Sequence, residues 1–124
     1  MRRIWLAVSW FACCVAPALA ADDIMAGYYG NTVIVTGGIA DSHTHYRSDH
    51  TFDISATAMF MHYAFKGTWM INDKGEICLA FADPAPPRTS NPYCRPAFAH
   101  KAGDVWTVTR NGSNRTMTMK AGIE

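Results

Sequence analysis

Three of the chain's five histidines fall within residues 41–50, which read Asp-Ser-His-Thr-His-Tyr-Arg-Ser-Asp-His. Imidazole gives or takes a proton near neutral pH because its unperturbed pKa is about 6.5, and its nitrogens are common metal ligands. This segment is therefore the first place in the sequence to look for a site.

Strand geometry decides which of these side chains can meet. Successive side chains of a β-strand point to opposite faces, so His43, His45 and Arg47 share one face. Thr44 and Tyr46 share the other face. Whether the third histidine joins the first two depends on the turn that follows.

A two-residue turn at Ser48-Asp49 would pair residue 45 with Phe52 and residue 43 with Ile54. Because paired residues share a face, His50 and the other two histidines would then lie on one surface with two apolar side chains. Such a surface is expected to point into the protein.

A three-residue turn gives a different surface. It leaves His50 at the tip and puts Thr51 and Asp53 beside the other two histidines. The sequence leaves both registers open, and the pocket hypothesis that follows depends on the first.

With the first register, the sequence predicts a pocket with imidazoles in its wall. The expected ligand is a small, partly apolar molecule, because ligand pockets combine apolar walls with a few polar groups. No cofactor is expected. The predicted ligand contacts are His43, His45, His50, Phe52 and Trp69.

The same segment would suit a lyase or isomerase that works without a cofactor. His45 or His50 would be the general base, because a positioned imidazole can remove a proton beside a carbonyl. Tyr46 or Asp49 would assist the base. Arg47 would counter the developing anion. The sequence contains no Gly-x-Ser-x-Gly nucleophile elbow.

Periplasmic binding of copper or zinc is the third hypothesis. His43 and His45 offer two nitrogens on one face, and the third would come from position 50, 62 or 100. Methionines at strand spacing, at 59 and 61 and again at 117 and 119, would suit copper(I). Methionine at alternate strand positions is also ordinary core filling, so no specific metal ligand is predicted.

The N-terminus has the pattern of a secretory signal peptide. Arg2 and Arg3 precede an apolar run, and Ala18-Leu-Ala20 forms a small-residue cleavage site. The predicted mature chain is one domain, residues 21–124, in the periplasm or outside the cell. It keeps 9 basic and 10 acidic side chains with no basic run, which predicts no nucleic-acid partner. No membrane contact is expected after cleavage, and a homo-oligomer is compatible with the sequence.

Cys13 and Cys14 belong to the predicted signal peptide, which leaves Cys78 and Cys94. In an oxidising compartment these two should form a disulfide, worth about 3 kcal/mol through its constraint on the unfolded chain. Zinc ligation by the pair is the alternative, but the spacing fits neither close-paired thiolate pattern.

The rest of the chain alternates β-branched and aromatic residues with polar ones, and it shows no helical periodicity. Asn72-Asp-Lys-Gly75 and Asn111-Gly-Ser-Asn114 predict hairpin turns. About eight short strands predict an all-β, antiparallel up-and-down barrel without exposed edges. The expected strands are 31–36, 42–47, 50–55, 58–65, 68–71, 76–82, 104–110 and 115–120.

Four short motifs follow one another along the chain: Gly30-Asn-Thr-Val33, Lys66-Gly-Thr-Trp-Met-Ile71, Asp73-Lys-Gly-Glu-Ile-Cys78 and Gly103-Asp-Val-Trp106. In this order, residues 27 to 122 resemble the small exported bacterial lipocalin-like (calycin-type) domains, many of them uncharacterised. The resemblance implies an up-and-down barrel with a disulfide between Cys78 and Cys94. It implies no particular activity. The family usually has Gly after the turn Asp where this chain has His50.

Overall fold

The computed structural model describes residues 21–110 and 112–124, and its dominant feature is one antiparallel β-sheet. The predicted signal peptide, residues 1–20, lies outside the described residues. The all-β class predicted from the sequence is confirmed. The strands are β1 Asn31–Thr36, β2 Asp41–Tyr46, β3 Thr51–Ala58, β4 Met61–Ile71, β5 Glu76–Phe81, β6 Tyr93–Pro96, β7 Val105–Arg110 and β8 Ser113–Ala121.

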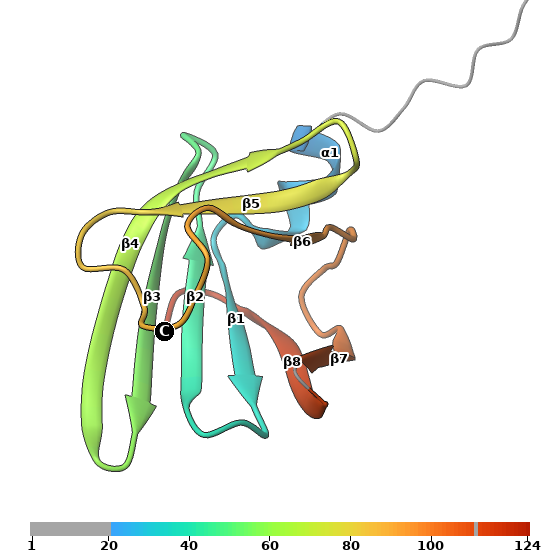
Figure 1. Cartoon of the computed structure of the whole chain (residues 1–124). Coiled ribbons are helices and arrows are strands. Elements are labelled where there is room, and N and C mark those ends of the chain that lie inside the picture. The colour runs from blue at the N-terminus through green and yellow to red at the C-terminus, as the bar shows by residue number, and fades with distance from the viewer. Residues whose placement is uncertain (1–20, 111) are drawn as a thin grey trace, which may run out of the picture.

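The strands pair in the up-and-down order β6-β5-β4-β3-β2-β1-β8-β7. The sheet curls into a half-barrel (Figure 1). β6 and β7 are its two edges, and no ladder joins them in the part of the chain that the structure describes. The up-and-down architecture is therefore confirmed, whereas the expectation that closure removes the exposed edges is wrong.

Strand β4 differs from its predicted course. The sequence predicts a break at Lys66-Gly67, but β4 runs through both residues without interruption. Gly67 lies opposite Phe52 of β3 and Phe81 of β5. A Cβ at Gly67 would lie 1.9 Å from the carbonyl oxygen of Ala80 and 3.1 Å from the Phe52 ring. The glycine makes room for close packing and does not mark a turn.

Three short elements escape prediction because they are too brief to show a periodicity. These are α1, Ala21–Met25, the 3₁₀ helix η1, Ala26–Tyr28, and the edge strand β6. A fourth difference is the turn at Met59 and Phe60, which the sequence-based prediction places inside a strand. Among the described residues, no helix is long and apolar enough to cross a membrane.

The core fills one end of the half-barrel, next to the β2–β3 and β4–β5 turns. Met25 and Tyr28 enter it from α1 and η1, and the rings of Phe52 and Trp69 are almost completely buried there. The remaining buried apolar side chains of the cluster are Val33, Tyr46, Ile77, Leu79, Met117 and Met119. The opposite end, where the β1–β2 and β3–β4 turns lie, is less filled.

Cys78 of β5 and Cys94 of β6 form the predicted disulfide. The two residues are also direct partners in the β5–β6 ladder. Because side chains alternate along a strand, Tyr93 and Arg95 on either side of Cys94 point into the half-barrel. The disulfide therefore holds in place the edge strand that carries these two side chains.

Gly67→Ala tests the packing at the centre of β4. The new methyl group would meet backbone, which cannot move aside, so we expect the free energy of unfolding to fall by about 3 kcal/mol. Gly38→Ala is the matched control, because its Cβ would meet only the guanidinium end of Arg115. Urea denaturation measures both variants. Equal midpoints for Gly67→Ala and the parent protein would contradict this explanation.

Candidate functional site

The β2–β3 hairpin closes with the three-residue turn Ser48-Asp49-His50. Tyr46 pairs with Phe52, and the N–H of Arg47 donates to the carbonyl of Thr51 at 2.9 Å. The last turn residue lies in the left-handed region, at φ 67°, as is usual in such loops. Histidine tolerates that region better than most non-glycine residues. The observed register is thus the second of the two that the sequence left open.

Contacts with Trp69 hold this turn. Its N–H donates to the carbonyl of His50 at 2.8 Å, and its indole Nε1–H donates to the carbonyl of Arg47 at 2.9 Å. The His50 ring stacks on the indole, with centroids 4.0 Å apart. Asp49 accepts hydrogen bonds from the hydroxyl and the N–H of Thr51, and these lower the pKa of Asp49. These contacts favour the longer turn over the two-residue alternative.

The register places His43 and His45 on the outer face of the sheet, opposite Ser55 and Asp53. The residues that alternate with them on β2 line the interior instead. The prediction that His43, His45 and His50 share an inward surface is therefore wrong.

The physical reason lies in what each register would bury. Phe52 faces inward in both registers. The registers differ in which set of alternating β2 side chains faces inward with it. The observed one puts the large ring of Tyr46 in the interior and leaves His45 buried on the outer face beside Asp53, whereas the alternative would put two imidazoles into the interior. Burial of polar groups costs free energy unless each finds a partner, which favours the tyrosine.

The predicted catalytic and ligand-binding residues do not converge. Tyr46 reaches the interior, whereas Arg47, Asp49 and His50 lie at the exposed turn. The predicted ligand contacts Phe52 and Trp69 lie in the packed core and do not line the interior cavity. An acid–base role for this set stays a prediction; of its members, only His45 and Arg47 meet, through Asp53 on the outer face.

A polar cluster does form on the outer face. Asp53 accepts from Nδ1 of His45 at 2.9 Å and also from the guanidinium of Arg47. Partial burial acts to raise the pKa of Asp53, but the two hydrogen bonds together lower it below its ordinary value. Nε2 of His45 is covered and has no hydrogen-bond partner. That nitrogen is therefore not presented to a dissolved substrate.

The structure brings no metal-binding set together. Within residues 21–110 and 112–124, no group of three or more His, Cys, Asp or Glu side chains is arranged to hold an ion. Met61 and His62 are neighbours on β4, so their side chains point to opposite faces. The His62 ring is hydrogen-bonded to Thr57, and Met61 Sδ accepts from the hydroxyl of Tyr63.

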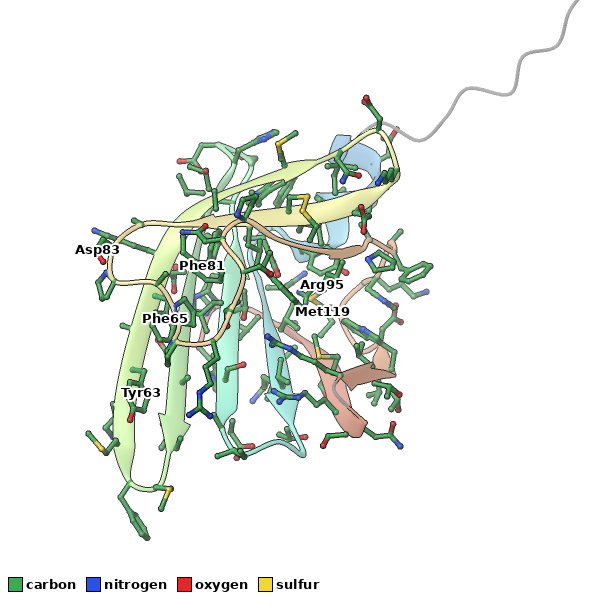
Figure 2. All side chains as sticks on the ribbon, viewed as in Figure 1. Tyr63, Phe65, Phe81, Asp83, Arg95 and Met119 are labelled. Carbon is green, nitrogen blue, oxygen red and sulfur yellow. A yellow bond between two sulfur atoms is a disulfide. The ribbon has the colours of Figure 1, made fainter. Side chains whose placement is uncertain are left out.

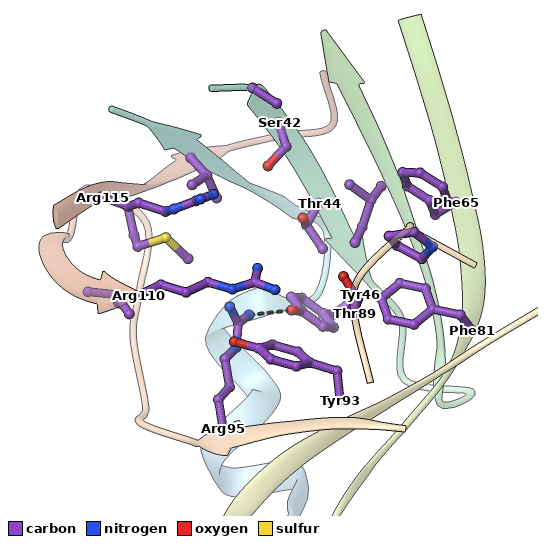
Figure 3. Close-up of a pocket in the computed structure, with 16 residues that line it drawn as sticks. Ser42, Thr44, Tyr46, Phe65, Phe81, Thr89, Tyr93, Arg95, Arg110 and Arg115 are labelled. Atoms are coloured by element: carbon purple, nitrogen blue, oxygen red, sulfur yellow. Dashed lines mark hydrogen bonds between the residues drawn. The ribbon is translucent and has the colours of Figure 1, made fainter. Parts of the chain in front are cut away.

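A cavity of about 190 Å³ occupies the half-barrel between the packed core and the β1–β2 and β3–β4 turns. Its apolar wall includes Ile54, Phe65 and Phe81. Figure 3 shows Phe65 and Phe81 on one side of the cavity and three arginines on the other. The polar lining residues are Ser42, Thr44, Tyr46, Thr89, Tyr93, Arg95, Arg110 and Arg115.

The three arginines come from three strands, β6, β7 and β8. Arg95 donates to the hydroxyl of Tyr46 at 2.8 Å, and this neighbour raises the pKa of Arg95. The guanidinium carbon of Arg110 lies 4.7 Å from the centroid of the Tyr93 ring. Nε of Arg115 is buried without a hydrogen-bond partner. Among the described residues that line this cavity there is no Asp or Glu.

A second hollow, of about 610 Å³, lies along the gap between β6 and β7. It adjoins the cavity, because both are lined by Arg95, Val108 and Met117. In its wall the rings of His100 and Trp106 stack with centroids 3.5 Å apart. The interior thus extends toward the unpaired sheet edges.

The arginines were not among the predicted site residues, although strand alternation could have indicated them. Arg110 follows Val108 by two positions, and Arg115 precedes Met117 by two, so each shares a face with a core residue. Arg95 follows an outward cysteine by one position. A histidine cluster attracts notice in a sequence, whereas isolated arginines on three strands become a group only in the folded sheet.

No family model, curated protein or solved structure matches the chain. The eight-stranded antiparallel half-barrel is compatible with a lipocalin-like fold. A fold of this kind accommodates many functions, so the function must be argued from the site.

Asp53→Asn tests the outer cluster. Because the folded pKa of Asp53 is lowered, its charge stabilises the fold above the unfolded pKa of about 3.9. That stabilisation is lost as the pH falls through the folded pKa. We expect the variant to be less stable by about 1 kcal/mol near neutral pH.

Urea denaturation at a series of pH values measures this difference, which should shrink toward acidic pH. Asp73→Asn, in the exposed β4–β5 turn, is the control and should show little change at any pH. A deficit in Asp53→Asn that stays constant at all pH values would rule out the proposed contribution of the carboxylate charge.

Proposed function

We propose that this protein binds a small anion with an apolar body, such as a carboxylate, inside the half-barrel. The observation that carries the proposal is the grouping of Arg95, Arg110 and Arg115 around one cavity whose described lining contains no acidic side chain. The apolar wall opposite them would receive the body of the ligand.

The energetics of buried charge support this proposal. A buried cation is costly unless an opposite charge or a full set of acceptors accompanies it. Arg95 and Arg110 contact a hydroxyl and an aromatic ring, neither of which is a carboxylate. The buried Nε of Arg115 has no acceptor at all. A bound carboxylate would supply both the acceptor and the charge, through the paired hydrogen bonds that guanidinium groups form.

The cavity volume limits the size of the ligand. Dry cavities of about 150 Å³ in other proteins admit a benzene molecule. A cavity of about 190 Å³ therefore suits a ring or short chain with one acidic group. A longer apolar body would have to extend into the hollow between β6 and β7.

We place this activity outside the cytoplasm. The predicted signal peptide, residues 1–20, motivates that assignment, and the disulfide of Cys78 and Cys94 is of the kind that persists in oxidising compartments. The small, partly apolar ligand expected from the sequence is retained in this proposal, but arginines replace histidines as its polar contacts.

Binding of benzoate compared with benzamide tests the proposal, because the two have nearly the same shape and only benzoate is charged. We expect benzoate to bind at least about tenfold more tightly, since a hydrogen bond to a charged group contributes about 1.5 to 3 kcal/mol. Titration calorimetry or chemical-shift mapping gives both affinities. Equal affinities for the two compounds would contradict the proposal.

Arg115→Met should weaken benzoate binding at least about tenfold, and at the same time raise the melting temperature of the empty protein. The rise is expected because an apolar side chain replaces a partly buried cation whose Nε has no partner. Lys74→Met, in the β4–β5 turn, removes the same charge at the far end of the sheet. It should leave benzoate affinity unchanged. If both variants lost benzoate affinity to the same extent, the effect would come from the net charge of the protein and the proposed site would be contradicted.

A further inference from the structure

The β3–β4 hairpin projects beyond the other loops at its end of the half-barrel (Figure 1). Its two turn residues, Met59 and Phe60, are 84% and 100% exposed, and Met61 beside them is also exposed. Ile39 in the β1–β2 loop, at the same end of the sheet, is 87% exposed. Large apolar side chains thus gather at one extremity of the molecule, where water would ordinarily select polar residues.

The turn itself is built from unfavourable residues. Met59 and Phe60 both have positive φ, 49° and 68°, which is the pattern of a type I′ turn. Asn-Gly is the preferred pair there, and each larger residue held in this region costs about 1 to 3 kcal/mol. Neither the fold nor the core needs a side chain at these positions. Strain of this kind is typical of segments whose side chains act on something outside the fold.

The hairpin carries no formal charge over a long stretch. Residues 54–65 contain no Asp, Glu, Lys or Arg, and the arms beyond Ile54 and Phe65 are mostly small residues. Their backbone groups face each other in a regular ladder that ends at the pair Ala58–Met61. On its other edge β4 pairs with β5 only from Gly67 onward, so only the turn and the first pair can enter an apolar medium with little loss of hydrogen bonding.

Along β4, the side chains change from apolar at the tip to partly polar farther from it, as expected for a segment that crosses from an apolar phase into water. Tyr63 and Phe65 follow each other along β4 (Figure 2), and strand alternation puts both, with Met61, on the face that lines the cavity. His62 lies on the other face. Tyrosine favours the boundary between an apolar phase and water, because its ring is apolar and its hydroxyl is polar.

The rim of the cavity adds positive charge at this end. Arg88, which is exposed, lies between two residues that line the cavity, and Arg110 and Arg115 flank the β7–β8 turn. Asp41 is the acidic residue at the start of β2 on this side. Arg110 and Arg115 lie across β2 and β1 from the tip and face the cavity, so the exposed Arg88 is the cation most available to anionic headgroups at this end.

We propose that the β3–β4 hairpin docks this protein on the surface of a phospholipid bilayer, with Met59, Phe60 and Met61 inserted between the acyl chains. Strand β2 accompanies β3 as far as the pair Asp41–Thr57, so only the pair Ala58–Met61 and the two turn residues project beyond the sheet. One leaflet of hydrocarbon is about 15 Å deep, half of a core of about 30 Å. The tip therefore enters one leaflet and leaves Tyr63 near the headgroups.

This docking would hold the open end of the cavity toward the bilayer, so that an amphiphilic anion could pass between lipid and protein. The docking stands on the hairpin alone and does not require the proposed ligand. It departs from the sequence-based expectation of no membrane contact after signal cleavage. A protein partner is the less suitable occupant, because the tip is convex and offers no charged group for specific pairing.

Co-sedimentation with vesicles of equal parts phosphatidylcholine and phosphatidylglycerol tests the docking. The full mature chain is expected to bind. Met59→Asn combined with Phe60→Gly should weaken binding at least about tenfold, since two large apolar side chains no longer enter the hydrocarbon. The same variant relieves the strained turn, so its melting temperature should not fall. Met70→Thr, which removes an exposed apolar side chain near the β4–β5 turn, is the control and should bind like the parent.

A second measurement reads the depth of insertion. Phe60→Trp introduces an indole at the tip, and lipids brominated on their acyl chains should quench its fluorescence. Failure of the parent chain to sediment with vesicles, or equal binding by the Asn-Gly turn variant, would overturn the proposal. The turn variant should bind benzoate as tightly as the parent does. The membrane-docking proposal and the anion-binding proposal can therefore fail independently.

Discussion

The pairing of Tyr46 with Phe52 is the constraint on which the rest of the structure depends. A shift of this hairpin by one residue would exchange every inward and outward side chain of β2. The shift is prevented by the turn that ends at His50, which is held by two hydrogen bonds and a stacked ring from Trp69. With the register fixed, Tyr46 points inward, where its hydroxyl meets Arg95, and the histidines of β2 face outward.

The half-barrel combines one well-packed end with one end that holds charge. Trp69, Phe52 and the N-terminal helical segment fill the first, and the disulfide fixes β6 at the edge of the sheet. That stability allows Arg95, Arg110 and Arg115 to be held around a small cavity without carboxylate partners in its described lining. Residues that lower the stability of the empty protein are typical of binding sites, where the ligand completes the interactions that the fold leaves open.

The sequence was sufficient for the class of fold, most of the strands and the disulfide, because each depends on local alternation, turn residues or a small number of cysteines. It failed where tertiary contacts decide. Gly67 signals a turn locally, but it lies inside a strand, where the backbone of Ala80 and the ring of Phe52 leave no room for a side chain. The histidine face depended on one turn, and only contacts with Trp69, distant in sequence, select its length. The arginines of the cavity lie on three strands, so their grouping is invisible until the sheet order is known.

The most direct test of the central claim is a crystal structure of the protein with 4-bromobenzoate, located by the anomalous signal of bromine. The account predicts the carboxylate inside the half-barrel, within hydrogen-bond distance of Nε of Arg115 and of the Arg95 guanidinium, with the ring against Phe65 and Phe81. A ligand bound only on the outer face beside His45, or an interior that stays empty at saturating concentration, would contradict it.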